Sequence, residues 1–144
     1  MMARASVVAL LLVGAAVGAC EPAPGTAEWQ GHVLQEVRSV ARLPASLRSS
    51  LEVDRLGLEG VADRGRPFNK TDVVDRSRPM RRFVVAGNEG DTWVVAIERG
   101  GRAYSVEVFL FTTGGPEPKQ TWVLFDRPNT LAELVNDISR SPGP

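Results

Sequence analysis

The sequence is poor in the residues that build metal and redox sites, with one cysteine, Cys20, and one histidine, His32, among its 144 residues. An internal disulfide needs two cysteines, and a zinc site of the usual kind needs several cysteine and histidine ligands. Motifs typical of a nucleophile elbow, a phosphate-binding loop or a dinucleotide site are also absent. The sequence therefore excludes an internal disulfide and such a zinc centre, and it predicts no metal and no cofactor.

Long apolar runs are equally scarce. Residues 5–17 form one uncharged apolar run of 13 residues after Arg4, whereas a membrane-spanning helix needs about 20. A basic start, a short apolar run and then the small residues Gly18 and Ala19 are typical of a secretory signal peptide.

The end of this leader reads Val17-Gly18-Ala19-Cys20 and resembles the lipobox of bacterial lipoproteins. The resemblance implies that residues 1–19 are removed as a signal peptide and that the Cys20 sulfur carries a diacylglycerol. Two or more acyl chains hold a protein stably at a membrane. Aspartate after the cysteine is typical of retention at the inner membrane, so Glu21 favours the outer membrane, facing the periplasm. The alternative is a plain secretory signal in which Cys20 is incidental.

The mature chain is predicted to be one tethered domain. Residues 20–26 comprise the modified cysteine and a short tether containing proline and glycine. Residues 27–140 are long enough for one α+β domain with a core of its own.

Helices are predicted on both sides of the chain's centre. Apolar residues recur every three or four positions from Trp29 to Val40, which predicts a helix over residues 27–43 that ends before Pro44. Residues 44–51 favour a second short helix, and residues 52–79 are expected to form loops with at most one short strand. The capping-box sequence from Thr130 to Glu133 predicts a C-terminal helix over residues 130–139.

Between these helices, residues 80–126 predict a four-stranded antiparallel meander. A two-residue turn at Gly100 and Gly101 would pair Val95 with Val106.

A three-residue turn over residues 88–90, with Gly90 in the left-handed conformation, would pair Val85 with Trp93. The fold class is therefore α+β, with the meander flanked in sequence by the two long helices.

One sheet face of this meander is expected to pack on the helices, and the other is also apolar. Residues 52–79 either cover that second face, which we favour, or leave it free as a binding surface. The second face is predicted to carry Val84, Ala86, Val94, Ala96, Phe109, Phe111 and Trp122.

Charge offers one candidate surface. The chain has 17 basic and 17 acidic side chains and no net charge at pH 7, so its composition does not favour nucleic acid. Basic residues nevertheless gather between residues 64 and 82, where an anionic membrane or an acidic partner is a candidate ligand. The alternative is that these arginines pair with Glu98 and Glu107. The candidate contact residues are Arg76, Arg78, Arg81 and Arg82.

The function predicted from these features is that of a membrane-anchored envelope lipoprotein acting as a non-enzymatic binding or structural module. A carboxylate-dependent hydrolase using Asp72 and Asp75 is the alternative, and it requires a cleft and one acid of raised pKa. An inhibitor of an enzyme is a third possibility. His32 is expected to face solvent, and no catalytic residue is assigned.

Overall fold

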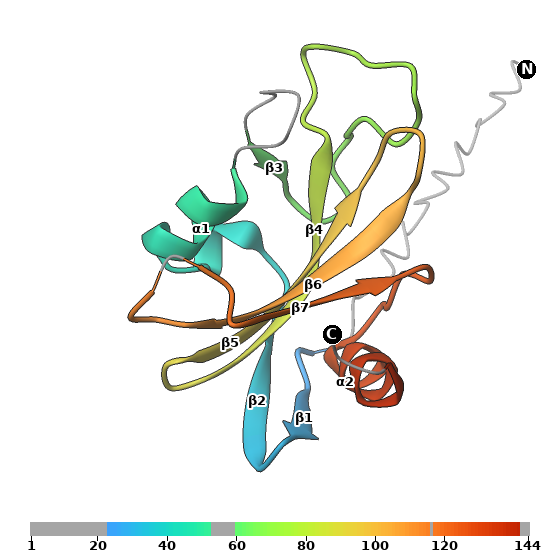
Figure 1. Cartoon of the computed structure of the whole chain (residues 1–144). Helices are drawn as coiled ribbons and strands as arrows, with labels where there is room; N and C mark the ends of the chain where they lie inside the picture. Colours follow the sequence, from blue (N-terminus) through green and yellow to red (C-terminus); the bar gives the residue numbers. More distant parts are fainter. Residues whose placement is uncertain (1–22, 53–59, 116, 142–144) are drawn as a thin grey trace, which may run out of the picture.

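The structure, a computed structural model, describes residues 23–52, 60–115 and 117–141 (Figure 1). Its main feature is an antiparallel sheet with the strand order β1-β2-β4-β5-β6-β7, and β3 lies parallel to the start of β4. The strands are β1 (Thr26–Trp29), β2 (His32–Val37), β3 (Val61–Ala62), β4 (Arg81–Glu89), β5 (Thr92–Arg99), β6 (Ser105–Thr112) and β7 (Gln120–Leu124). The helices are the 3₁₀ helix η1 (Val40–Arg42), α1 (Ala45–Leu51) and α2 (Leu131–Arg140).

The predicted α+β class and the meander from β4 to β7 are confirmed. The short helix predicted over residues 44–51 is present as α1, and residues 60–79 are loops apart from β3. The rest of the segment predicted as loops, residues 53–59, lies outside the described residues, as do residues 1–22 with the whole leader and Cys20. No helix in the described part of the chain is long and apolar enough to cross a membrane.

The helix predicted over residues 27–43 is wrong, because this segment forms the β1–β2 hairpin and η1. Gln30 and Gly31 have φ angles of 48° and 83°, which break a helix and form a two-residue hairpin turn. Trp29 and Leu34 are buried, while Val33 of the supposed helical stripe is 46% exposed. The apolar residues Trp29 and Val33 lie on opposite faces of the hairpin, and their spacing of four positions only resembled that of a helix.

The predicted register between β4 and β5 is also wrong. The turn has two residues, Gly90 and Asp91, and Trp93 pairs with Asn88 instead of Val85. Gly90 has a φ of 54°, so its left-handed conformation is confirmed. The side chain of Asn88 donates hydrogen bonds to the carbonyls of Gly90 and Thr92 and thereby stabilises this tighter turn. A bulge between Phe83 and Val85 then shifts the register once more.

The connection from β5 to β6 spans residues 100–104 and not the predicted pair of glycines. Val95 consequently pairs with Phe109 instead of Val106, a shift of three positions. An odd shift turns every side chain of β6 to the opposite face of the sheet from the one predicted.

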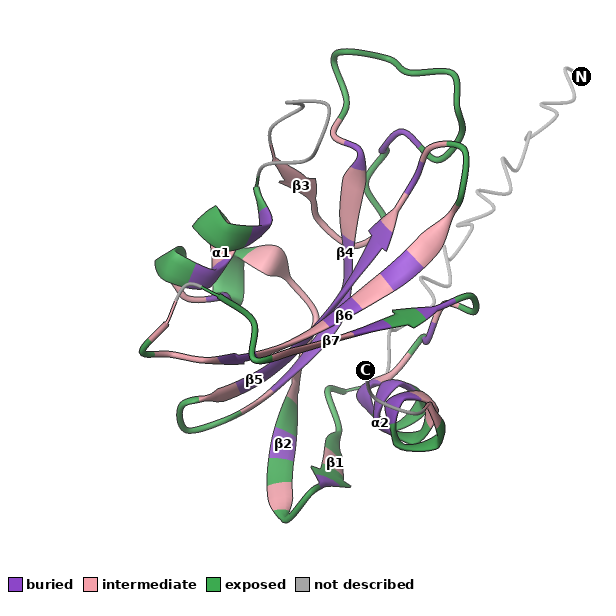
Figure 2. Cartoon of the chain, in the orientation of Figure 1, coloured by how far each residue is buried: buried purple, intermediate pink, exposed green. Residues whose placement is uncertain are grey.

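Both faces of the sheet are covered, so the second face is not a free surface (Figure 2). The helix α2 packs on one face, and we call the core on that side the α2 cluster. The helices η1 and α1 pack on the other face, and we call that core the α1 cluster. Residues 52–79, which were expected to cover the second face, contribute only Val61 to the α1 cluster among the described residues. The residues predicted to share one face are divided between them. The α2 cluster contains Val84, Val94, Ala96 and Trp122, and the α1 cluster contains Ala86 and Phe111, with Phe109 packed against it.

The C-terminal helix forms as predicted. The Thr130 hydroxyl accepts a hydrogen bond from the Glu133 backbone N–H, and the Glu133 carboxylate accepts one from the Asn129 N–H. The capping box therefore closes one residue further out than its usual form. Four buried side chains make its apolar stripe, namely Leu131, Leu134, Val135 and Ile138.

Candidate functional site

The loop from residue 69 to residue 79 is closed on the buried side chain of Asn69. The Asn69 Nδ2 donates to the carbonyls of Asp75 at 2.8 Å and Arg78 at 2.6 Å, and its Oδ1 accepts from the Asp75 N–H at 2.8 Å. The Asn69 backbone N–H donates to the Pro79 carbonyl at 2.9 Å. The two ends of the loop are thus held together around one amide, as in a compact Ω-type loop.

The base of this loop rests on the β5–β6 connection. A side chain at Gly100 would place its Cβ 1.6 Å from the carbonyl oxygen of Asn69, so only glycine permits the contact. The Gly100 N–H also donates to the Met80 carbonyl at 3.0 Å. The glycine that suggested a tight hairpin turn instead allows two backbone segments to touch.

The tip of the loop presents apolar side chains to solvent. Val73 is 80% exposed and Val74 is 40% exposed. Lys70, Asp72 and Arg76 around them are also exposed. This is the loop that leads into β4 at the top of Figure 1, and it is coloured as exposed in Figure 2. A pair of exposed valines on a loop with a fixed base has the properties of a recognition surface.

The four candidate arginines fall into two groups. Arg76 is exposed, and Arg78 is half-exposed with its Nε 3.1 Å from the Asp75 Oδ2. The other two are largely buried by internal contacts. Arg81 donates to the Leu51 carbonyl at 3.0 Å and lies 3.8 Å from Glu107.

Arg82 binds the Glu98 carboxylate, donates to the Arg66 carbonyl at 3.2 Å and stacks 4.3 Å above the ring of Phe68. Pairing with Glu98 and Glu107 was the alternative that the sequence left open, and Arg81 and Arg82 follow it.

Glu98 is the centre of a buried ionic cluster at this end of the sheet. Its side chain is 1% exposed, and it contacts Arg82, the Arg127 Nε at 3.4 Å and the Tyr104 hydroxyl, which donates at 2.9 Å. Burial and this hydrogen bond raise the pKa of Tyr104 to about 12. The two arginines and the Tyr104 hydroxyl offset the cost of removing the Glu98 carboxylate from water, which explains how this charge is accommodated in the core. Sequence reasoning missed Tyr104 and Arg127 because no local pattern links them to Glu98.

The proposed acid pair lacks the properties of a catalytic site. Asp72 and Asp75 are both exposed. Hydrogen bonds from the Ser77 hydroxyl and N–H lower the pKa of Asp75, the opposite of what a general acid needs. His32 is 41% exposed, as expected, and its Nδ1 lies 2.6 Å from Glu89. Within residues 23–52, 60–115 and 117–141, no group of three metal-ligating side chains comes together.

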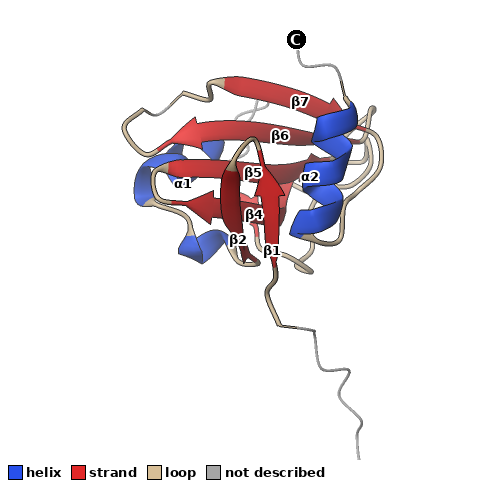
Figure 3. Ribbon diagram, turned by 90° about the horizontal axis from the view of Figure 1, so that it is seen from below, coloured by secondary structure: helices blue, strands red, loops and turns tan. Residues whose placement is uncertain are grey.

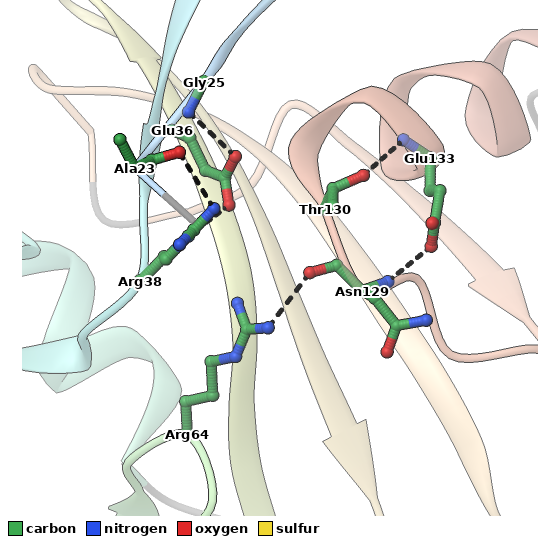
Figure 4. Close-up of polar contacts among 8 residues, drawn as sticks. All are labelled: Ala23, Gly25, Glu36, Arg38, Arg64, Asn129, Thr130 and Glu133. Carbon is green, nitrogen blue, oxygen red and sulfur yellow. Dashed lines mark hydrogen bonds and ion pairs between the residues drawn. The ribbon is translucent and has the colours of Figure 1, made fainter. Parts of the chain in front are cut away.

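The start of the described chain is fixed against β2 (Figure 4). The buried carboxylate of Glu36 accepts hydrogen bonds from the Gly25 N–H at 3.2 Å and from Arg38 at 2.6 Å, and Arg38 also donates to the Ala23 carbonyl. Beside them, Arg64 donates to the Asn129 carbonyl next to the start of α2. The polypeptide therefore leaves the domain at a defined point.

Comparisons with models of protein families, with curated proteins and with solved structures gave no match.

Proposed function

We propose that this chain is a membrane-anchored envelope lipoprotein that acts as a non-enzymatic binding module, with the loop 69–79 as its recognition surface. The observation that carries the proposal is the exposure of Val73 and Val74 on a loop whose base is fixed by Asn69. A preformed loop loses little conformational entropy when it binds, so its exposed valines contribute to affinity without a large ordering cost. The partner proposed is an envelope protein with an apolar contact site and acidic groups that match Arg76 and Arg78.

The anchor in this proposal is a lipid on Cys20. Three residue steps separate Cys20 from Ala23, which corresponds to at most about 10 Å of extended chain. Arg38, which directly follows β2, donates a hydrogen bond to the Ala23 carbonyl. A lipid-bearing Cys20 would therefore keep the domain close to the membrane and restrict the partners it can meet to those at the same surface.

The test is site-specific photo-crosslinking in intact cells. A photo-reactive amino acid is placed at Val73, at Val74 or, as the control, at Val123, an exposed valine on β7. We expect one discrete crosslinked protein from positions 73 and 74 and none from position 123. The crosslink should weaken in the double variant Arg76→Glu and Arg78→Glu, and it should be lost in Cys20→Ala because the domain is no longer held at the surface.

Two results would overturn the proposal. If positions 73, 74 and 123 all give the same crosslinks, the loop is not a specific surface. If Cys20→Ala leaves the protein in the membrane fraction, the lipid anchor is wrong, whatever the loop contacts. An inhibitor of an envelope enzyme is a special case of the proposal, and the identity of the crosslinked protein distinguishes it.

A further inference from the structure

The two edges of the sheet approach each other at the end of α2. In the strand order, β1 and β7 are the first and last strands. The rings of Trp29 on β1 and Trp122 on β7 are nevertheless only 5.9 Å apart, in an edge-to-face arrangement. Figure 3 shows the sheet curved, with α2 lying beside β1. The sheet is therefore almost closed through this pair of tryptophans.

A groove of about 400 Å³ lies where these edges meet, and we call it the edge groove. This volume lies within the range of small-molecule sites, about 300–1,000 Å³. The β1 side of the groove is formed by Glu28, Trp29 and Gln30, and the β7 side by Gln120 and Trp122, with the end of α2 between them. The edge groove thus lies between the β1–β2 hairpin, β7 and the end of α2, and it shares no residue with the loop 69–79.

Gln30 at the rim of the groove has an unfavourable backbone conformation. It is the one non-glycine residue with a positive φ in the described part of the chain. Two-residue hairpin turns with positive φ strongly favour asparagine, aspartate or glycine at this position. Residues held in such conformations concentrate at binding sites, where the side chain has a role that offsets the strain. Gln30 is one of the residues that line the edge groove, which gives it such a role.

The chemistry of the groove selects the class of ligand. Gln30 and Gln120 offer amides that both donate and accept hydrogen bonds, and Ser139 adds a hydroxyl. The two indoles are each 5% exposed and supply an apolar edge. The lining also includes the acidic residue Glu28 and, among the described residues, no arginine or lysine, so a phosphate or another anion finds no cation there. The lining is mostly polar, with Ile138 as its one aliphatic residue.

We infer that the edge groove binds an uncharged glycan chain. Hydroxyl and acetamido groups of a sugar match the paired amides, and the apolar face of a sugar ring matches the indole edges. This inference depends neither on the lipid at Cys20 nor on the loop 69–79.

The experiment titrates N-acetylchitohexaose into the ¹⁵N-labelled full chain in detergent and follows the three tryptophan indole N–H signals by NMR. Trp29 and Trp122 line the groove, whereas Trp93 belongs to the α1 cluster and serves as an internal control. We expect saturable shifts of the Trp29 and Trp122 signals and no shift of the Trp93 signal. An uncharged Gly-Ser-Asn peptide is titrated in parallel.

The variant Gln30→Gly separates binding from folding. Glycine accepts a positive φ, so the variant should melt at or above the temperature of the wild type while its affinity for the glycan falls at least tenfold. Gln35→Ala, on the exposed part of β2, should keep the wild-type affinity. The inference is overturned if the groove tryptophans do not respond, if the peptide shifts them as strongly as the glycan, or if Gln30→Gly binds like the wild type.

Discussion

Asn69 is the residue on which the order of the loop 69–79 depends most directly. Its side chain is buried and makes three hydrogen bonds to the backbone of the loop. In Asn69→Leu the size is similar, but those backbone groups lose their partner, so we expect a loss of about 1–3 kcal/mol in the free energy of unfolding. Trypsin should also cut the native variant faster after Arg76. Urea denaturation and timed proteolysis measure both effects, with the exposed helical Asn136→Leu as control. Unchanged cleavage after Arg76 would contradict the role of Asn69.

Glu36 provides a prediction for pH dependence. Burial raises the pKa of Glu36, but the hydrogen bonds from Arg38 and Gly25 and the charges of Arg38 and Arg64 outweigh it, so the pKa is lower than usual. A carboxyl with a lowered pKa stabilises the fold above its unfolded pKa, and this contribution disappears as the pH falls through the folded value. Glu36→Gln should therefore cost about 1–3 kcal/mol near neutral pH.

The difference between wild type and Glu36→Gln should narrow as the pH falls below the ordinary carboxyl pKa of 4.5. Urea denaturation at neutral and acidic pH measures it, with Glu117→Gln at an exposed position as control. A difference that does not change with pH would show that the charge of Glu36 is irrelevant and that only its shape matters.

At the scale of elements, α2 is the best test of local sequence signals. The Thr130 hydroxyl accepts from the Glu133 N–H at 3.2 Å, and the helix buries an apolar stripe over one sheet face. Thr130→Ala should lower the free energy of unfolding by about 1 kcal/mol because one backbone donor loses its cap. Thermal melts of this variant and of Thr71→Ala, in an exposed loop, measure the effect. Equal melting temperatures would show that packing alone holds the helix.

Local signals of this kind explain what could be predicted from the sequence. The α2 cap, the left-handed Gly90 and the existence of the four meander strands each depend on neighbouring residues, and all are confirmed. The β4–β5 register was missed because the predicted three-residue turn did not allow for the hydrogen bonds of Asn88. The β5–β6 register was missed because it depends on a distant contact. Gly100 is required by the backbone of Asn69, about thirty positions away in the sequence, and this contact lengthens the connection that looked like a tight turn.

The candidate site, like the fold, was predictable only where it depends on neighbouring residues. The exposed charged segment around Arg76 was recognised, and so was the alternative that Glu98 pairs with an arginine. Three features were not recognised: the hydrogen bonds of Asn69, the hydrogen bond from Tyr104 to Glu98, and the edge groove. Each of them depends on contacts that form only in the folded chain. No periodicity or spacing in the sequence reports such contacts.

At the scale of the whole molecule, the contact between Trp29 and Trp122 couples the first and last strands of the sheet. An aromatic pair in this geometry contributes about 0.5–1.5 kcal/mol beyond the area it buries. In a double-mutant cycle, Trp29→Leu and Trp122→Leu should therefore be less destabilising together than the sum of the single changes, by about that amount. Chemical denaturation of the four proteins measures the coupling.

The control is a second cycle that pairs Trp29→Leu with Trp93→Leu. Trp93 lies in the α1 cluster, so these two changes should have additive effects. Additivity in the first cycle would mean that the two edges are held by α2 and not by each other.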